Sequence, residues 1–296
     1  MIIVTKTLVE VKSLTKKYDK EHGIFDVSFS LNSGEAVAFI GPSGSGKTTT
    51  LKCLVNILKP DEGSVKLFGR DFKKYYNDIM QFTSYLPSED FKYDNMNVIE
   101  FLLYANSFYE TNYETEINRL LELFKLNSKQ KIKTLSLGEK KKLLIILAFF
   151  HDSKIYILDE PCESLDPLMQ DIFFNLVKEK KAEGATILFT SHQLNNLSII
   201  CDRVIFINKG KITHNMKIND LKQFYKKITF KANKDFQDKL KNLEGVKNLE
   251  IIEDRANFLY AGDINILLKR LASFDLKDLI IENPSIDELF LHYYNE

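Results

Sequence analysis

Cysteine is scarce in this chain of 296 residues, which has only Cys53, Cys162 and Cys201. The three lie far apart, and no spacing between them is typical of a metal site. An odd and sparse count argues against a disulfide framework and favours reduced thiols in a cytoplasmic protein. We expect all three to be small, half-buried hydrophobic side chains.

Long hydrophobic runs are missing as well, since the longest covers only residues 143–150. A helix that crosses a bilayer needs roughly 20 apolar residues. The first residues lack the basic segment, apolar core and cleavage site of a signal peptide, so we expect none. A role at a membrane would therefore need a partner that supplies the membrane-spanning part.

Neither sign of charge is in excess, because 41 Lys and Arg balance 41 Asp and Glu. The chain thus lacks the overall basic character of nucleic-acid-binding proteins, and we expect no nucleic-acid partner. Its hydrophobic fraction of 44% is ordinary for a globular protein. The length allows one large domain or two of ordinary size.

The most informative segment is the phosphate loop, residues Gly41–Thr48, with the sequence GPSGSGKT. It fits the pattern G-x-x-x-x-G-K-[ST] at every fixed position. Glycines let the backbone curl and direct its N–H groups at phosphate oxygens, and a helix that begins near Gly46 adds its positive end. Lys47 would supply a point charge for the outer phosphates, and the Thr48 hydroxyl a ligand for Mg²⁺.

The surroundings of the phosphate loop favour this interpretation over a Gly/Ser turn with a chance lysine. Residues 35–40 form an apolar run typical of a buried strand, and residues 49–55 continue as a helix. Strand and helix patterns then alternate, which indicates a parallel sheet covered by helices. Further strands are predicted at residues 25–31, 64–68, 155–158, 186–190 and 204–207, and helices within 97–137 and at 172–181.

The pattern changes near Asp220. From there the order of predicted elements is strand, helix, strand, strand, helix, strand, which is that of the ferredoxin-like unit. We therefore expect two domains, residues 1–220 with an α/β fold and residues 221–296 with a small α+β fold. The elements of the second are predicted at 227–232, 236–243, 249–252, 256–260, 264–271 and 279–281, with a closing helix at 286–293.

Two acids follow the predicted strand 155–158. Asp159 stands where an α/β sheet presents ligand-binding groups, and a carboxylate suits Mg²⁺. Glu160 points to the other side of the strand and could accept a proton from an attacking water. The alternative is an acidic strand end that leads into a turn, but the phosphate loop upstream favours the chemical role.

The segment LSLGE, residues 135–139, precedes a predicted helix. Ser136 and Glu139 form the pattern of a capping box, which would explain them without any ligand. A serine and a glycine at a helix N-terminus also form an anion site. Both interpretations stay open for residues 136–139, which we name the signature turn.

Together with residues 164–166 and the pair Ser191–His192, these motifs follow one another in an order that resembles the ATP-binding cassette (ABC) ATPases. The resemblance covers about residues 8–210. It implies a P-loop α/β domain with a mainly parallel sheet, antiparallel N-terminal strands and a helical subdomain at about residues 88–145. It also implies that ATP and Mg²⁺ bind and that ATP is hydrolysed.

The resemblance implies a role for each motif. Tyr18 falls where the family places an aromatic ring that stacks on adenine. Lys47, Glu160 and His192 would be catalytic, Glu160 as the base and His192 through a contact with the γ-phosphate. Thr48 and Asp159 would bind Mg²⁺. The residues that would hold the phosphates are Gly41, Pro42, Ser43, Gly44, Ser45, Gly46, Lys47, Thr48 and Thr49.

In this family two nucleotide domains meet head to tail. Ser136, Leu137, Gly138 and Glu139 of one copy would therefore cap the ATP held by the other, and Asp166 would help to join the two copies. The sequence carries one set of motifs. Hydrolysis should thus need a homodimer, or a heterodimer with a homologous chain.

Residues 284–291, PSIDELFL, resemble the closing segment of ATPase subunits from the drug, bacteriocin and sodium exporter branch. Leu137, in place of a second glycine, also suits that branch. Such subunits bind a separate membrane permease, so we expect an ATP-hydrolysing exporter subunit, cytoplasmic and peripheral on the inner face of the membrane. The alternatives are a soluble ABC ATPase of DNA repair or translation, and a regulatory or immunity module with weak hydrolysis.

One position departs from the family. Its members have a glutamine, sometimes a glutamate, in a loop that touches Mg²⁺ and the permease, and alignment through Tyr85-Leu86-Pro87 places Ser88 there. A serine hydroxyl is shorter and could reach Mg²⁺ only through water. Glu89 could substitute if the loop shifts by one residue. The departure affects the expected rate of hydrolysis and its coupling to transport, but not ATP binding.

Overall fold

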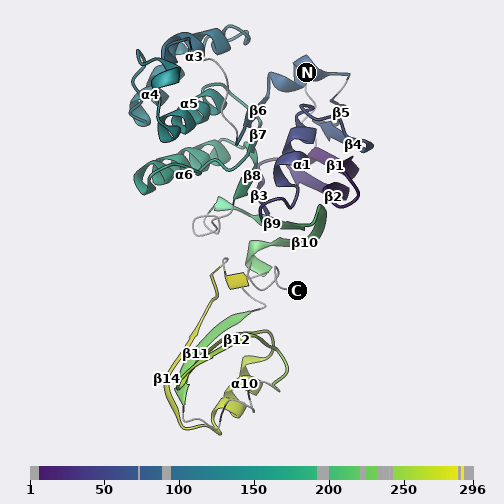
Figure 1. Ribbon diagram of the computed structural model, residues 1–296, viewed down its shortest axis with the longest axis vertical. Helices are drawn as coiled ribbons and strands as arrows, with labels where there is room; N and C mark the ends of the chain where they lie inside the picture. The colour runs from purple at the N-terminus through teal and green to yellow at the C-terminus, as the bar shows by residue number, and fades with distance from the viewer. Residues whose placement is uncertain are drawn as a thin grey trace. The chain divides into compact units, whose positions relative to one another are not determined.

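The structure is a computed structural model that describes residues 7–72, 74–88, 95–191, 200–220, 225–232, 236, 240, 243–285 and 288–289. These residues form two compact units, the first up to residue 215 and the second from residue 216 onward. Figure 1 shows the elements of each. The boundary between the units lies close to residue 220, where the sequence predicts the division between domains.

The first unit is built around a six-stranded sheet with the order β10-β9-β3-β8-β7-β6. Its inner pairs, from β9 through β3, β8 and β7 to β6, are all parallel, so the predicted parallel sheet is confirmed. The strands are β3 (Ala36–Ile40), β6 (Thr83–Leu86), β7 (Ile155–Leu158), β8 (Thr186–Ser191), β9 (Arg203–Asn208) and β10 (Lys211–Lys217). All of β3 and β7 is buried, because both faces of this sheet are covered.

A second, antiparallel sheet with the order β2-β1-β4-β5 packs beside it. Its strands are β1 (Thr7–Lys17), β2 (Gly23–Asn32), β4 (Glu62–Leu67) and β5 (Arg70–Asp71). The two sheets and helix α1 (Lys47–Leu54) share one hydrophobic core, in which the rings of Phe29 and Phe39 lie 5.6 Å apart. This core fixes the position of the loop between β3 and α1.

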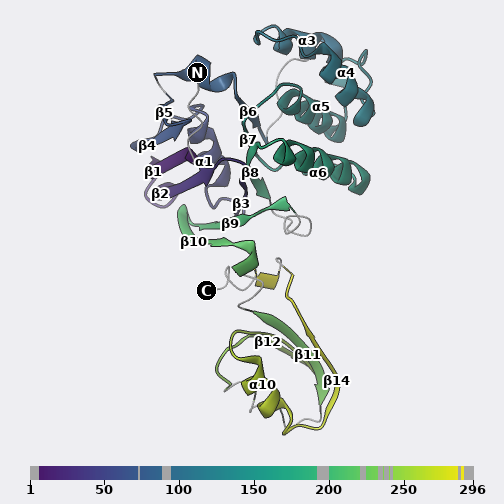
Figure 2. The ribbon, with the colours of Figure 1, turned by 180° about the vertical axis from the view of Figure 1, so that it is seen from behind.

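Helices α3 to α6 gather beside β6 and β7, whereas α1 lies toward β1 and β2 (Figures 1 and 2). Helix α6 starts before the predicted residue 172, because the Asp166 carboxylate accepts a hydrogen bond from the Met169 N–H at 3.0 Å and caps it. Helix α5 continues past residue 145, where the family resemblance places the end of the helical subdomain, and most of its later residues are buried. The helices are α2 (Tyr76–Met80), α3 (Val98–Asn106), α4 (Glu114–Leu123), α5 (Leu137–Phe149) and α6 (Pro167–Ala182).

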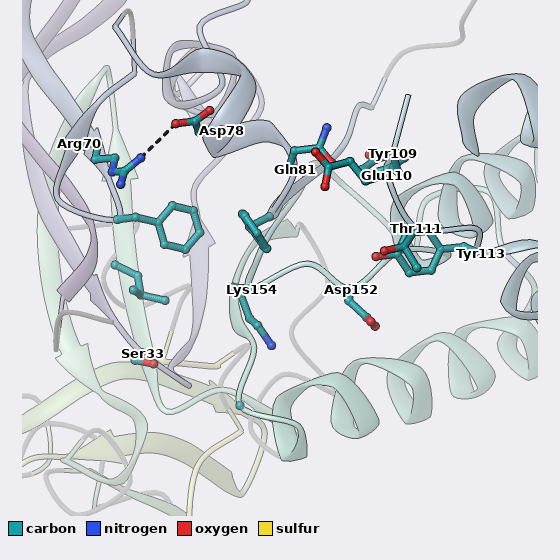
Figure 3. A pocket seen from close by; sticks show the side chains of 14 residues that line it. Ser33, Arg70, Asp78, Gln81, Tyr109, Glu110, Thr111, Tyr113, Asp152 and Lys154 are labelled. Atoms are coloured by element: carbon teal, nitrogen blue, oxygen red, sulfur yellow. Dashed lines mark hydrogen bonds and ion pairs between the residues drawn. The ribbon is translucent and has the colours of Figure 1, made fainter. Parts of the chain in front are cut away.

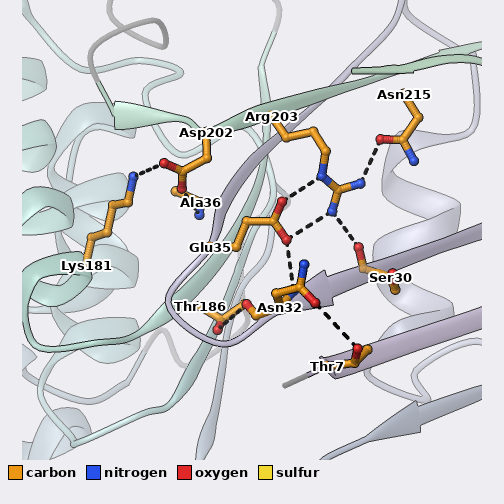
Figure 4. Close-up of polar contacts among 10 residues, drawn as sticks. All are labelled: Thr7, Ser30, Asn32, Glu35, Ala36, Lys181, Thr186, Asp202, Arg203 and Asn215. Carbon is orange, nitrogen blue, oxygen red and sulfur yellow. Dashed lines mark hydrogen bonds and ion pairs between the residues drawn. The ribbon is translucent and has the colours of Figure 1, made fainter. Parts of the chain in front are cut away.

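An ion pair ties the turn before β3 to the start of β9 (Figure 4). Arg203 Nε lies 2.7 Å from Glu35 Oε1, and each side chain is only 14% exposed. The same guanidinium donates to the carbonyl of Ser30 on β2 and to Asn215. Next to it, the Asp202 carboxylate accepts from the N–H of Ala36 at 2.9 Å. These bonds join both sheets of the first unit at one point.

We expect Arg203→Met to lower the free energy of unfolding of the first unit by about 3 kcal/mol, because it leaves the largely buried Glu35 carboxylate without its cation. Urea unfolding, followed by circular dichroism, measures the loss. The matched control is Lys12→Met, which removes an ion pair with Glu10 in which the lysine is 64% exposed. Such a pair contributes less than about 1 kcal/mol. Equal losses in the two variants would contradict the expectation.

The second unit is a four-stranded antiparallel sheet with the order β12-β13-β11-β14. The predicted hairpin forms as β12 (Val246–Ile252) and β13 (Arg255–Tyr260), and the predicted helix forms as α10 (Ile264–Leu271). The remaining strands are β11 (Lys226–Ala232) and β14 (Leu276–Glu282). The helices predicted at 236–243 and 286–293 lie mostly outside the described residues, so the ferredoxin-like assignment stays a prediction.

The cysteines are free thiols, as the sequence predicts, and Cys53 and Cys201 are more deeply buried than expected. Burial raises the pKa of Cys53 to about 11 and that of Cys162 to about 12. These thiols are therefore protonated and unreactive at neutral pH. In the part of the chain that the structure describes, no helix is long and apolar enough to cross a membrane.

Candidate functional site

The phosphate loop joins β3 to α1 as predicted, and the helix begins at Lys47 with Gly46 as its N-cap. Gly44 and Gly46 have φ of 77° and 104°, a region that glycine adopts without strain. A Cβ atom at Gly41 would lie 2.2 Å from the carbonyl oxygen of Ile207 on β9. The glycines therefore let the loop curl tightly against the sheet, which leaves its backbone open toward a ligand.

Lys47 is buried inside its own loop, with a side chain only 6% exposed. Its ammonium donates to the carbonyl oxygens of Gly41 at 2.7 Å and of Pro42 at 3.1 Å. It also lies 3.6 Å from Glu160 Oε1. Burial lowers the pKa of Lys47, and the charges of Glu160 and Asp159 oppose that shift. One positive charge thus stands at the base of the loop, between the backbone and the two acids.

Asp159, at the end of β7, is fully buried. Its Oδ1 accepts a hydrogen bond from the Thr190 hydroxyl at 2.8 Å, and its buried Oδ2 has no hydrogen-bond partner among the described residues. An orphaned buried carboxylate oxygen is unfavourable on its own and fits a divalent cation, which prefers oxygen ligands. Together with the Thr48 hydroxyl, Asp159 offers oxygen donors that suit Mg²⁺.

Thr190, on the neighbouring strand β8, was not among the predicted site residues. Its hydroxyl donates to Asp159 and accepts the backbone N–H of Glu160 at 2.8 Å, so it fixes both acids. The sequence contains a signal that could have found it, because Thr190 immediately precedes the Ser191–His192 pair at the carboxyl end of a strand. The carboxyl ends of neighbouring parallel strands meet at one edge, where α/β sheets bind their ligands.

Glu160 has a φ of 45°, a left-handed conformation that costs a non-glycine residue on the order of 1 kcal/mol. Its carboxylate is directed at Lys47, with only 12% of the side chain exposed. A residue held in such a conformation next to a buried cation is typical of functional sites. This geometry fits a side chain whose carboxylate must point into a cavity.

A cavity of about 400 Å³ brings together residues that the sequence predicted separately. It is lined by Tyr18, the phosphate loop, Ser88 and Glu160, although these come from distant parts of the chain. Tyr18 is 60% exposed there, so its ring face is accessible. The lining residues are Tyr18, His22, Gly23, Ser43, Gly44, Gly46, Lys47, Thr48, Thr49, Ser88 and Glu160.

His22 and Gly23 also line this cavity, although sequence reasoning missed them. The Asp19 carboxylate accepts hydrogen bonds from the N–H groups of Glu21 and His22 and lies 2.7 Å from Nδ1 of the His22 ring. These bonds fix the turn that follows Tyr18. In the sequence, only their closeness to Tyr18 could have indicated His22 and Gly23 as site residues.

Other predicted residues do not line the cavity. The lining does not include Gly41, Pro42 and Ser45 of the phosphate loop or Asp159, which follows β7, and His192 lies outside the described residues. The signature turn and Asp166 are absent from its lining. The predicted capping box is confirmed, with Ser136 N–H donating to Glu139 Oε2 at 2.8 Å, while Leu137 is 66% exposed. The signature turn is thus free to contact another molecule.

A larger cavity, of about 710 Å³, lies elsewhere (Figure 3). It includes the ion pair between Arg70 and Asp78, and none of the predicted site residues. Phe82 and Lys154 in its lining immediately precede β6 and β7, so it lies toward the amino ends of the parallel strands. Ligands of open α/β sheets bind at the carboxyl ends. Size alone would therefore select a cavity away from the phosphate loop.

Comparison with known proteins agrees with this geometry. The family model of the ABC transporter matches residues 24–163. The ABC transporter ATP-binding protein YxlF of Bacillus subtilis (strain 168), itself described as uncharacterized, is 33% identical over 73% of this chain and 73% of its own length.

Two solved structures are similar to this chain. The ATP-binding subunit of an ABC transporter has a TM-score of 0.68 and 30% identity, over 73% of this chain and 92% of its own. The ATP-binding cassette MJ0796, solved as a dimer in a post-hydrolysis state bound to ADP and Pi, has a TM-score of 0.63 and 23% identity, over 71% and 99%, and shows likeness of fold. With the phosphate loop, the paired acids and the signature turn in place, the chain belongs to the ATP-binding proteins of ABC transporters.

Proposed function

We propose that this chain is the ATP-hydrolysing subunit of an ABC exporter and powers a separate membrane permease. One observation carries the proposal. A single cavity assembles Tyr18, the phosphate loop, Ser88 and Glu160, while the signature turn lies outside that cavity on an exposed helix end. This division of parts fits an ATP site that is completed by a second chain.

The residues suit ATP and Mg²⁺ in the following way. The phosphate loop and Lys47 would hold the phosphates, with Tyr18 against the adenine. The Thr48 hydroxyl and Asp159 Oδ2 would hold Mg²⁺, which when bound neutralises phosphate charge. Glu160 would accept the proton of the attacking water, because its carboxylate faces the cavity. His192 would contact the γ-phosphate.

A second ATP-binding chain, identical or homologous, would complete the site. Ser136 and Glu139 begin α5 with a satisfied capping box, so the remaining N–H groups of this helix end and its positive dipole can face a phosphate. The signature turn of one copy would thus cap the ATP of the other, and Asp166 would contribute to the contact between copies.

The permease would dock next to Ser88. An apolar groove of about 360 Å³ runs between β6, α3 and α5 and includes Pro87, the residue before Ser88. Tyr104 and Phe108 line it and are 46% and 62% exposed, an unusual degree for neighbouring aromatic rings of a free surface. A helix of the permease would cover them. The chain would then be cytoplasmic and peripheral on the inner face of the membrane.

The test is co-purification of a permease with the tagged chain from detergent-solubilised membranes, followed by ATPase measurements on the complex. We expect a membrane protein to co-purify and to raise the rate of ATP hydrolysis. Recovery without any membrane protein would instead favour a soluble ABC ATPase. Binding of ATP without single-turnover hydrolysis would favour a regulatory or immunity module.

Ser88→Gln should raise the rate of hydrolysis by the complex by roughly fivefold, the effect of about 1 kcal/mol on the barrier. The longer side chain brings a carboxamide oxygen toward Mg²⁺, where serine needs an intervening water. Ser88→Ala is the control, because it removes the hydroxyl without adding reach, and should not raise the rate. Glu89, the alternative ligand, lies outside the described residues. A Gln variant no faster than wild type would contradict this account of Ser88.

A further inference from the structure

Lys141 is a buried lysine on α5 that the proposed reaction does not use. It lies shortly after the signature turn, and it is only 5% exposed. Its ammonium donates a hydrogen bond to the backbone carbonyl oxygen of Glu160 at 3.1 Å. Lysine is rarely buried unless its charge is paired. Its partner here belongs to the proposed catalytic base.

The charges around Lys141 come from the same segment. Burial lowers the pKa of Lys141, and the nearby charges of Glu163, Asp159 and Glu160 oppose that shift. The ammonium thus provides a counter-charge for acids on both sides of the Glu160 carbonyl. Without this cation, the mutual repulsion of these acids would be less compensated. The backbone would also have one hydrogen bond fewer to hold it.

The start of α5 also contacts this segment directly. A Cβ atom at Gly138 in the signature turn would lie 3.0 Å from the carbonyl oxygen of Ser164. Glu160 and Ser164 have φ of 45° and 65°, so the segment has a left-handed residue at each of these positions without glycine. Such conformations persist only where neighbouring groups hold them. Lys141 and the close approach at Gly138 are two such constraints.

We infer that Lys141 is a positioning residue that holds the backbone of Glu160 so that its carboxylate faces the cavity, and thereby links the signature turn to the catalytic base of the same chain. The inference rests on the proposed function. Without the bond from Lys141, Glu160 loses one of the contacts that oppose relaxation toward a right-handed φ, and its carboxylate turns away from Lys47. Glu160 then meets the attacking water in poor geometry.

The link has a consequence for a pair of chains. The signature turn of one chain would contact the ATP of its partner, whereas Lys141, on the same helix, reaches the base that acts on the chain's own ATP. The effect of nucleotide binding at one site would therefore reach the catalytic base of the other site through a single helix, α5. Turnover should depend on ATP concentration with positive cooperativity, and this cooperativity should require Lys141.

The test compares Lys141→Met with wild type in the full chain bound to its permease. We expect kcat to fall by about tenfold to a hundredfold, because misplacement of a reacting group by about 1 Å has effects of that size. The Kd for ATP should change less than about twofold, and the Hill coefficient of turnover should fall toward one. Lys178→Met, on the exposed face of α6, is the matched control and should change none of these three values.

A double variant separates positioning from general stability. In a Glu160→Gln background, Lys141→Met should have no further effect on the residual turnover, because the base that it positions is already gone. If it lowers that turnover by the same factor as in wild type, the inference is overturned. A weaker Kd with unchanged kcat would overturn it too.

Folding of the variant is checked by its thermal unfolding midpoint. If Lys141→Met lowers this midpoint, Lys141→Arg decides, since it keeps a buried cationic donor and should recover most of kcat. A correctly folded Lys141→Arg as slow as Lys141→Met would overturn the inference. A wild-type complex that binds ATP but never hydrolyses it would overturn the proposed function and this inference together, so the two failures differ.

Discussion

Replacement of Glu160 by glutamine should abolish most ATP turnover while ATP binding is retained. The amide has the shape of the carboxylate but cannot accept a proton, and general-base catalysis contributes about 10²- to 10⁴-fold to a rate. Binding should not weaken, because the lost negative charge lies 3.6 Å from Lys47 and would otherwise repel a triphosphate. Phosphate release by the complex with its permease and equilibrium binding of ATP measure the two properties.

The control is Glu122→Gln on α4, which neutralises an exposed carboxylate far along the chain from the phosphate loop. It should leave both turnover and binding unchanged. If the Glu160→Gln complex hydrolyses ATP at the wild-type rate, Glu160 is not the base. If ATP binding is lost together with turnover, the carboxylate has a structural role in the loop that the present geometry does not account for.

Lys47→Met, in contrast to Glu160→Gln, should weaken ATP binding itself. Hydrogen bonds to charged groups contribute about 1.5–3 kcal/mol, so removal of the ammonium should weaken the Kd for ATP by about 10- to 150-fold. The thioether chain keeps most of the buried volume, which limits any loss of packing. Isothermal titration of ATP into the purified chain measures the effect.

Lys59→Met removes an exposed lysine and serves as the control, with no expected change in affinity. An unchanged Kd in Lys47→Met would mean that the phosphates bind elsewhere, and it would contradict the proposed site. The contrast between the Lys47 and Glu160 variants is informative, because the two side chains are neighbours yet should affect different steps.

The features that follow from local pattern were predictable. The apolar run before the phosphate loop became β3, which is buried throughout, and the helix after the loop starts at Lys47 as the glycine spacing indicates. The strand 155–158 appears with the predicted bounds as β7. Each of these depends on residues close together in sequence, so a single sequence contains the information.

Features that depend on distant contacts were missed. Strand β6 was not predicted, because Thr83 and Ser84 are polar yet only 1% and 2% exposed. The Ser84 hydroxyl donates to the carbonyl oxygen of Ala148 on α5, so its burial is stabilised by a contact that no local pattern encodes. The contacts of Thr190 with Asp159 and of Lys141 with Glu160 likewise form only when β7, β8 and α5 come together. The role of His192 stays a prediction.

The position of Lys47 has one more consequence. Its ammonium already donates hydrogen bonds to two carbonyl oxygens of the phosphate loop. A bound triphosphate would therefore replace these oxygens as partners of the lysine. The affinity for nucleotide would then reflect the difference between two sets of hydrogen-bond partners of the same cation. Such an exchange would let a nucleotide leave without leaving the buried ammonium unpaired, and the rate of nucleotide exchange would depend on how fast Lys47 changes its oxygen partners.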